Sequence, residues 1–366
     1  MLSLTLYLDR TQWLKHLRHM EELYPDYVPV IKGNGYGFGS VRLAQEAWEA
    51  GKDKIAAGTI EEARQLIKLH NFTEILILTP VVTELRAADF TKFIFTIGSL
   101  GQLHHLLQSA QKLNYSLPIM IVFKCESTMR RYGLSPQDLA LANTLVSTAP
   151  ISIQIEGYAL HFALERLTDR DKLSEIDAWL KTFEELGLNQ TKLYISHLTP
   201  TVLQQASLKH PTTTFVMRLG TSLWLGDTST YSFRTNVLDV KPIKFGERFG
   251  YKQKTAWRDG YLIYVSGGTA NGIGMESPSH AKGLMARLKL TLFWLLSLCN
   301  FNLSPFTYKG HKLWFAEPPH MQASILKVPK KISPPFPGEE LIIKNLRMTI
   351  AKFDEIVELE PQTSCN

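Results

Sequence analysis

The residue best placed for covalent chemistry is Lys32, which follows the apolar run 28–31 in the segment Lys-Gly-Asn-Gly-Tyr-Gly. A lysine at the end of a buried strand is desolvated, which disfavours its charged form and lowers its pKa. A neutral amine can form a Schiff base with an aldehyde cofactor. Many strand-end lysines are merely solvated, but the three glycines after Lys32 let backbone approach closely, and this favours a functional site.

Other basic side chains also follow apolar runs. Arg131 lies seven residues after Lys124, which ends such a run. Arginine can grip a carboxylate through two parallel hydrogen bonds. His161 and His197 end two further runs in succession, although a single histidine is more often packed or solvated than catalytic. Two histidines at successive strand ends are a better indication of a site than either one alone.

A phosphate site is indicated by Arg218, which is followed by Gly220 and Thr221. In barrel enzymes, backbone N–H groups beyond the last strand commonly bind phosphate. The whole set matches what pyridoxal phosphate requires: an amine for the aldehyde, a nest for the phosphate and a partner for the ring nitrogen. We find no Walker loop, dinucleotide-binding glycine motif, His-Glu-x-x-His motif or nucleophile elbow that would compete with it.

The elements that must position these residues alternate regularly over the first two thirds of the chain. We expect strands at Val28–Lys32, Lys54–Thr59, Glu74–Thr79, Phe93–Gly98, Pro118–Lys124, Ile151–His161, Lys192–His197 and Thr213–Arg218. Helical stretches are expected at Ser40–Ala50, Ile60–His70, Leu100–Leu113, Pro136–Ser147, Asp169–Leu186 and Pro200–Lys209. Evenly spaced strand–helix units favour a closed (β/α)₈ barrel of the TIM type over an open doubly wound sheet.

The texture of the sequence changes after the last of these units. Gly, Pro and Thr become frequent, and Tyr261–Ser266 and Ser324–Val328 are typical of strands. Only Ala281–Cys299 has helical character, and Glu360–Asn366 is expected to be a frayed tail. We therefore predict a cofactor-binding barrel domain over residues 10–228. A mainly β domain over 229–366, joined by an N-terminal strand at 1–9, would follow it.

Composition narrows the class of protein. A formal charge of +6 suits an anionic ligand, but the basic residues are scattered, which disfavours nucleic acid. Three cysteines in 366 residues fit no metal motif and indicate a reducing compartment. The run 290–299 is about half the roughly 20 residues that cross a bilayer, so we expect a buried helix or an oligomer contact there. We predict a cytoplasmic protein without a secretory signal, bound metal, nucleic-acid partner or membrane partner.

These motifs resemble those of the alanine racemases, two-domain enzymes that use pyridoxal 5'-phosphate. The segment from Lys32 is similar to the family's Lys-Ala-Asn/Asp-Ala-Tyr-Gly-His-Gly. The resemblance implies that Lys32 holds the cofactor and acts as one catalytic base, and that Tyr36 contacts the phosphate. Lys124 to Arg131 matches the spacing of Lys-x-Asp-Thr-Gly-Met-x-Arg. It implies that Arg131 binds the substrate carboxylate and that Lys124 is a candidate for carbamylation.

The resemblance assigns further residues. His161 would lie against the cofactor ring, and Arg218 would face its pyridine nitrogen. Phosphate would be bound by Gly220 and Thr221, and by Thr201 in the segment His-Leu-Thr-Pro-Thr.

In the second domain the resemblance assigns two residues. Gly-Glu-Arg-Phe-Gly-Tyr ends in Tyr251, which would be the second base and would reach the site of the partner subunit in a homodimer. Met321 would line the substrate pocket.

This sequence also departs from the family pattern. Gly-Tyr-Ala-Asp-Gly becomes Gly268-Thr269-Ala270-Asn271-Gly272, which removes a gate tyrosine, and Met-Asp-Gln becomes Met321-Gln322-Ala323. The segment 275–317 is longer than usual. These changes leave three readings open: an alanine racemase that supplies D-alanine for peptidoglycan, a racemase of another amino acid such as serine, and a cofactor-binding homologue without turnover. A decarboxylase is disfavoured, because the second domain lacks a cysteine-bearing motif of that class.

Racemisation requires that a proton be removed from one face of Cα and delivered to the other. Two bases on opposite faces, Lys32 and Tyr251, would do this without moving the substrate. A free tyrosine has a pKa of about 10, so Tyr251 would need a hydrogen-bonded chain through His161 and Arg218.

Overall fold

The computed structural model describes residues 4–188, 192–275 and 283–359. The predicted tail at 360–366 lies outside the described residues. Contacts divide the chain into two compact units, and the division falls within one helix. We call Lys15–Gly226 the barrel unit, and Met1–Leu14 with Asp227–Asn366 the β unit.

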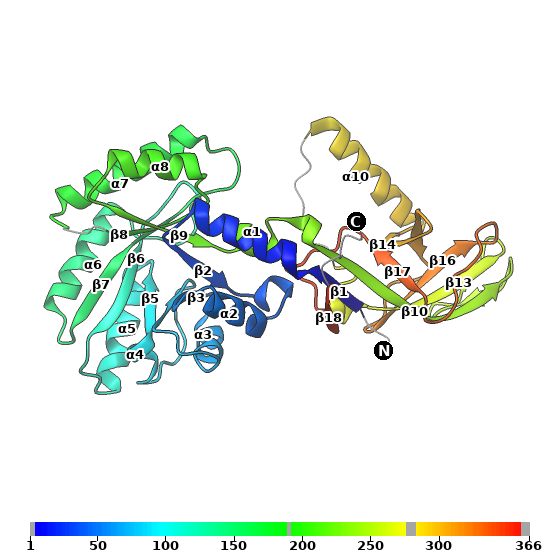
Figure 1. Ribbon diagram of the computed structural model, residues 1–366, viewed down its shortest axis with the longest axis horizontal. Helices are drawn as coiled ribbons and strands as arrows, with labels where there is room; N and C mark the ends of the chain where they lie inside the picture. Colours follow the sequence, from blue (N-terminus) through cyan, green and yellow to red (C-terminus); the bar gives the residue numbers. More distant parts are fainter. Residues whose placement is uncertain (1–3, 189–191, 276–282, 360–366) are drawn as a thin grey trace, which may run out of the picture. The chain divides into compact units, whose positions relative to one another are not determined.

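The barrel unit contains eight parallel strands that form a closed barrel in sequence order, with the last strand pairing with the first (Figure 1). They are β2 (Tyr27–Ile31), β3 (Lys54–Ala57), β4 (Glu74–Ile77), β5 (Phe93–Ile97), β6 (Ile119–Lys124), β7 (Ile153–His161), β8 (Lys192–Ser196) and β9 (Thr214–Leu219). All eight predicted strands are present, and the closed barrel, rather than the open sheet, is confirmed.

Helices lie outside the ring of strands (Figure 1). They are α2 (Ser40–Glu49), α3 (Ile60–Leu66), α4 (Asp89–Lys92), α5 (Leu100–Lys112), α6 (Pro136–Thr148), α7 (Asp169–Glu185), α8 (Pro200–Lys209) and α9 (Thr221–Leu225), with the short η1 (Gly35–Gly37). A capping box between Thr59 and Glu62 stabilises the start of α3. Helix α1 (Arg10–Leu23) was not predicted from the sequence, because Trp13 and Met20 are its only buried apolar residues and its hydrophobic stripe is narrow.

The inside of the barrel is filled by side chains. Val28, Val30, Leu76, Val122 and Tyr194 belong to one buried cluster, to which neighbouring strands contribute small residues such as alanine. A barrel packed in this way is a core and not a pore, so a ligand site must lie at one end of it.

The β unit is built on an eight-stranded sheet in the order β13-β16-β15-β14-β17-β10-β1-β18. The strands are β1 (Leu4–Asp9), β10 (Tyr231–Ile243), β13 (Gly260–Ser266), β14 (Leu303–Tyr308), β15 (His311–Phe315), β16 (Ala323–Pro329), β17 (Glu340–Ile343) and β18 (Glu355–Leu359). A separate hairpin joins β11 (Arg248–Phe249) to β12 (Lys254–Thr255), and the turns η2 (Thr228–Thr230) and η3 (Thr269–Asn271) complete the unit. The mainly β character predicted for this part is confirmed.

The N-terminal strand β1 belongs to this sheet. It pairs antiparallel with β10, with Leu6 opposite Phe233, and parallel with β18, with Leu6 opposite Ile356. Leu4, Leu6 and Leu8 are fully buried, so the alternation of apolar residues in this strand faces the core of the unit.

The helix expected near 281–299 is present as α10 (Gly283–Leu298). None of its residues is buried within the chain, so the expectation of a buried helix is wrong. Leu284, Met285 and Trp294 are each more than 60% exposed, and an oligomer contact stays a prediction. Among the residues described, no helix combines the length and the apolar character needed to cross a bilayer.

Candidate active site

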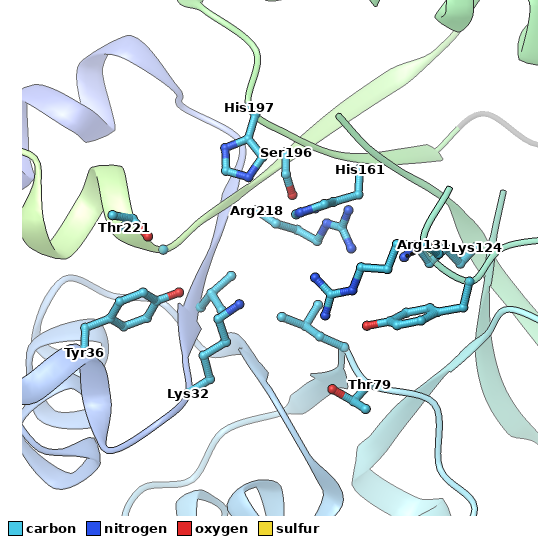
Figure 2. Close-up of a pocket in the computed structure, with 14 residues that line it drawn as sticks. Lys32, Tyr36, Thr79, Lys124, Arg131, His161, Ser196, His197, Arg218 and Thr221 are labelled. Atoms are coloured by element: carbon cyan, nitrogen blue, oxygen red, sulfur yellow. Dashed lines mark hydrogen bonds between the residues drawn. The ribbon is translucent and has the colours of Figure 1, made fainter. Parts of the chain in front are cut away.

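A pocket lies at the carboxyl ends of the barrel strands, where several sequence-predicted residues converge (Figure 2). Its lining consists of Val30, Lys32, Tyr36, Leu78, Thr79, Lys124, Arg131, Tyr132, His161, Ser196, His197, Arg218, Gly220 and Thr221. Parallel strands in a closed barrel bring their carboxyl ends together, so residues far apart in sequence meet here.

Lys32 enters the pocket from the tight turn that follows β2. Gly33, Asn34, Gly35 and Tyr36 all have positive φ angles between 53° and 57°, a conformation that strongly favours glycine. The side chain of Glu62 holds this turn by accepting hydrogen bonds from the backbone N–H of Gly33, at 2.6 Å, and of Gly58, at 3.0 Å. Strained backbone that neighbours hold in place is typical of functional sites.

The surroundings of Lys32 favour its neutral form. Burial lowers the pKa of its amine, and the charges of Arg131 and Arg218 lower it further, with Glu62 acting in the opposite direction. Figure 2 shows the Lys32 amine directed into the pocket, towards the guanidinium of Arg131. A neutral amine in such a position is a nucleophile and a base.

Lys124, Arg131 and Tyr132 form one group. Lys124 is 5% exposed, donates a hydrogen bond to the carbonyl of Arg131 at 3.3 Å, and lies 3.8 Å from the ring centre of Tyr132. Burial, with the charges of Arg218 and Arg131, lowers the pKa of Lys124 to about 7. The guanidinium carbon of Arg131 lies 4.9 Å from the same ring, so Tyr132 supports both cations.

Arg218 is a buried residue of the pocket lining. Its Nη2 donates to the carbonyl of Leu160 at 2.7 Å, whereas its Nε, also buried, has no hydrogen-bond partner in the described part of the chain. Burial lowers the pKa of Arg218 to about 10. An unsatisfied buried donor is costly unless a ligand supplies the acceptor.

The two histidines pack edge to face, with ring centres 4.9 Å apart. Burial, followed by the charge of Arg218 and the neighbouring His197, lowers the pKa of His161 to about 2. The pKa of His197 is lowered mainly by its own burial and then by Arg218. Burial therefore favours the neutral imidazole at His161.

One end of the pocket, away from Lys124, is formed by Tyr36, Gly220 and Thr221. Gly220 has to be a glycine, because a Cβ at this position would collide with the hydroxyl of Tyr36. Burial raises the pKa of Tyr36, so its hydroxyl remains a hydrogen-bond donor. Trp224 fixes α9 to the first barrel strand by donating from its indole N–H to the carbonyl of Val30 at 2.8 Å.

The charge of the pocket is one-sided. Its lining includes two lysines, two arginines and two histidines, and no residue in that lining is a carboxylate. With no carboxylate in the lining to balance the guanidiniums of Arg131 and Arg218, the pocket attracts an anion. The site therefore suits a ligand with several negative groups.

Not all predicted site residues lie in the pocket. Thr201 is exposed in the first turn of α8 and is absent from the pocket lining, so its phosphate contact stays a prediction. Tyr251 and Met321 belong to the β unit and are 85% and 74% exposed. Their roles also stay predictions.

Four residues that shape the pocket were not predicted from the sequence. Tyr132, Thr79 and Ser196 line it, and Glu62 ties down the turn after Lys32. Tyr132 directly follows Arg131, and Ser196 directly precedes His197. Their places beside predicted residues were the signal that could have identified them. The hydrogen bond that Gly33 donates to Glu62 joins the turn after β2 to the helix after β3. The sequence gave no indication of this bond beyond the capping box at Thr59 and Glu62.

The fold and the pocket define a two-part protein, in which a parallel barrel carries a pocket lined by basic side chains beside a strand-end lysine, and a mainly β unit follows. A family model described as "Alanine racemase, N-terminal domain" matches residues 8–227, which is more than half of the chain. The chain therefore belongs to the alanine racemase family, as a divergent member.

Individual relatives are distant. An alanine racemase of Dichelobacter nodosus is 27% identical over 264 residues, covering 69% of this chain and 71% of that protein. An alanine racemase of Latilactobacillus sakei is 30% identical over 150 residues, covering 40% of this chain and only 39% of that protein.

Solved structures agree in fold. An alanine racemase from Streptomyces lavendulae superimposes with a TM-score of 0.70 at 19% identity, covering 99% of this chain and 98% of that one. A histidine racemase from Leuconostoc mesenteroides superimposes with a TM-score of 0.64 at 15% identity, covering 97% of each chain.

Proposed function

We propose that this protein is a pyridoxal-phosphate-dependent amino-acid racemase that interconverts L- and D-alanine. The observation that carries the proposal is the pocket of six basic side chains that includes Lys32, an amine whose pKa burial lowers. Membership of the alanine racemase family supports the reaction type.

The pocket fits the cofactor on two structural observations. Among the described residues, the buried Nε of Arg218 has no acceptor, which suits the ring nitrogen of a pyridine. The glycine at 220 leaves room for the Tyr36 hydroxyl, beside which a phosphate would accept hydrogen bonds from Tyr36 and Thr221. Lys32 would hold the aldehyde, and the neutral ring of His161 would lie against the pyridine. When bound, the cofactor supplies an electron-withdrawing ring system that makes the Cα proton of an amino acid removable.

The remaining chemistry belongs to side chains of this protein. Arg131, supported on Tyr132, would bind the substrate carboxylate through two hydrogen bonds. The neutral amine of Lys32 would take or return the Cα proton on one face. Arginine rather than a carboxylate at the ring nitrogen would keep that nitrogen unprotonated, which limits side reactions such as transamination.

The second face needs a second base, for which we propose Tyr251. This residue lies in the β unit and is 85% exposed, as expected of a side chain that completes the site of another subunit. We therefore propose a homodimer with shared sites. Helix α10 would be covered in that assembly, because a helix with so many exposed apolar side chains is normally buried.

A racemase of another amino acid is the second candidate. Thr269 stands where the family has a gate tyrosine, and a smaller side chain at a gate admits larger substrates. The likeness in fold to a histidine racemase supports this second candidate.

One assay separates these functions. The protein, supplied with pyridoxal phosphate, is incubated in heavy water with L-alanine, L-serine or L-histidine. Deuterium at Cα and the D-isomer are then followed. We expect both products with L-alanine, faster than with the other two. Faster turnover of another amino acid would replace alanine as substrate, and neither product with any amino acid would favour a binding protein without turnover.

A further inference from the structure

A buried carboxylate in the β unit holds the segment that carries Tyr251. The side chain of Glu317 is 3% exposed. Its Oε2 accepts a hydrogen bond from the backbone N–H of Tyr251 at 2.9 Å, and its Oε1 lies 2.8 Å from Nε2 of His320. These two donors supply the hydrogen bonds that a buried carboxylate needs, so Glu317 links the tyrosine and the histidine.

His320 contacts Tyr251 directly as well. The two ring centres are 4.9 Å apart and the rings are tilted by 54°. Tyr251 is otherwise 85% exposed. One face of the phenol thus rests on an imidazole that is itself tied to Glu317, while the rest of the side chain is open to a ligand.

Local packing explains why these residues meet. Phe249 and Ala316 belong to the same buried apolar cluster, and Ala316 is fixed by a hydrogen bond from its N–H to the carbonyl of Ile325 at 2.8 Å. Tyr251 follows the first of these anchors by two residues, and Glu317 directly follows the second. Gly250, which lies between Phe249 and Tyr251 in the sequence, has a φ of +72°, and a Cβ there would collide with the Glu317 carboxyl group.

The segment 268–272, in which the sequence departs from the family pattern, contacts the same part of the β unit. The N–H of Thr269 donates to the carbonyl of His320 at 2.8 Å, and that of Ala270 donates to the carbonyl of Met321 at 3.0 Å. The altered gate segment therefore rests on the residues that support Tyr251. A substitution in the gate segment is therefore expected to affect the residues that support Tyr251.

We propose that Glu317 and His320 are positioning residues that hold the Tyr251 phenol in the orientation needed for proton transfer. This inference rests on the proposed function, in which Tyr251 is the second base. An exposed tyrosine at a hairpin turn samples several rotamers, and fixing its backbone and one ring face removes that freedom before substrate binds.

The first test does not depend on turnover. The full-length, cofactor-free protein is labelled with 3-fluorotyrosine, and the ¹⁹F resonance of Tyr251 is assigned by its absence from Tyr251→Phe. We expect Glu317→Ala and His320→Asn to move this resonance towards the position of free fluorotyrosine and to narrow it. Glu317→Gln, which keeps an oxygen acceptor, and His320→Phe, which keeps a ring, should each retain part of the original shift.

The second test is kinetic and uses the holoenzyme. Glu317→Ala should lower kcat about 10- to 100-fold in the direction in which Tyr251 removes the proton, because a lost hydrogen bond to a charged group has about this effect. KM and the visible absorbance of the bound cofactor should stay within about twofold of the wild type, a split that general loss of structure would not produce.

Glu340→Ala is the matched control. Glu340 also accepts hydrogen bonds within the β unit, but from Tyr7 and Arg234 rather than from the backbone of Tyr251. Glu340→Ala should leave the ¹⁹F resonance of Tyr251 unchanged. It should also cause no selective fall in kcat in the direction in which Tyr251 removes the proton. An unmoved Tyr251 resonance in folded Glu317→Ala and His320→Asn would overturn the positioning role. A moved resonance, with no effect of Tyr251→Phe on either direction, would instead overturn the second-base proposal.

Discussion

The barrel unit and the β unit carry their candidate site residues in opposite ways. In the barrel, Lys124 and Arg218 are buried among other cations, and their pKa values are lowered. In the β unit, Tyr251 and Met321 project into solvent from turns. The first arrangement suits an anionic ligand. In the proposed function, the second would be half of a site that a partner subunit completes.

The distribution of charge differs between the units in a way that bulk composition hides. Lys15–Gly226 contains equal numbers of basic and acidic residues, so the whole formal charge of +6 falls in the β unit. The pocket that suits an anion nevertheless lies in the unit with no net charge. Local placement of cations, and not the total charge, decides what a pocket binds.

Removing the amine of the barrel site should have the largest effect. Lys32→Ala deletes the only side chain proposed both to hold the cofactor and to move a proton. We expect loss of the visible absorbance band and a fall in racemisation of at least about 10³-fold. Absorption spectra and turnover after addition of pyridoxal phosphate measure this. A colourless wild-type protein would contradict the cofactor proposal itself.

Tyr251→Phe should distinguish the role of the β unit from that of the barrel unit. Loss of the phenol should slow proton exchange by about 10²- to 10³-fold when the reaction starts from one enantiomer, and less from the other. Cofactor absorbance should persist, because the cofactor residues lie in the barrel. Deuterium uptake from L- and D-alanine in separate reactions measures the asymmetry, and equal, mild losses would count against two bases.

Arg131→Lys is a smaller change within the barrel. Lysine keeps the charge but cannot form two parallel hydrogen bonds to a carboxylate. We expect KM for the amino acid to rise roughly 10-fold, with cofactor binding retained. Steady-state kinetics and a cofactor titration distinguish the two. Loss of the cofactor instead would show that Arg131 serves the cofactor and not the substrate.

The smallest effect concerns stability and pH. The pKa of Lys124 is about 7 in the folded protein and about 10.4 in an unfolded chain. Between these values the unfolded chain binds the additional proton, so stability should rise with pH, by about 1 kcal/mol per pH unit at most. Below pH 7 both states are protonated and this gain is absent.

Denaturant unfolding of the cofactor-free protein at several pH values tests this slope, and Lys124→Met should flatten it. The same neutral amine could react with carbon dioxide. A bicarbonate-dependent mass increase that is lost in Lys124→Met would indicate carbamylation. An identical pH slope in the variant would show that Lys124 is charged in the folded protein.

Periodicity and strand-end residues were enough to predict the barrel and much of its pocket. Lys32, Lys124, His161 and Arg218 were all found because each directly ends or follows an apolar run. Helix α1 was missed because few of its residues are buried. The environment of α10 was misjudged because an apolar sequence does not reveal what covers it.

The sequence alone determined the alternation of strands and helices and the chemical type of residue at each strand end, because both depend on local pattern. Only the tertiary structure decided that six basic groups share one pocket and that Glu317 supports Tyr251. It also decided that, within the described part of the chain, a buried nitrogen of Arg218 has no acceptor. Burial, pKa and hydrogen-bond partners depend on residues that are distant along the chain. They come together only when the barrel closes and the hairpin packs.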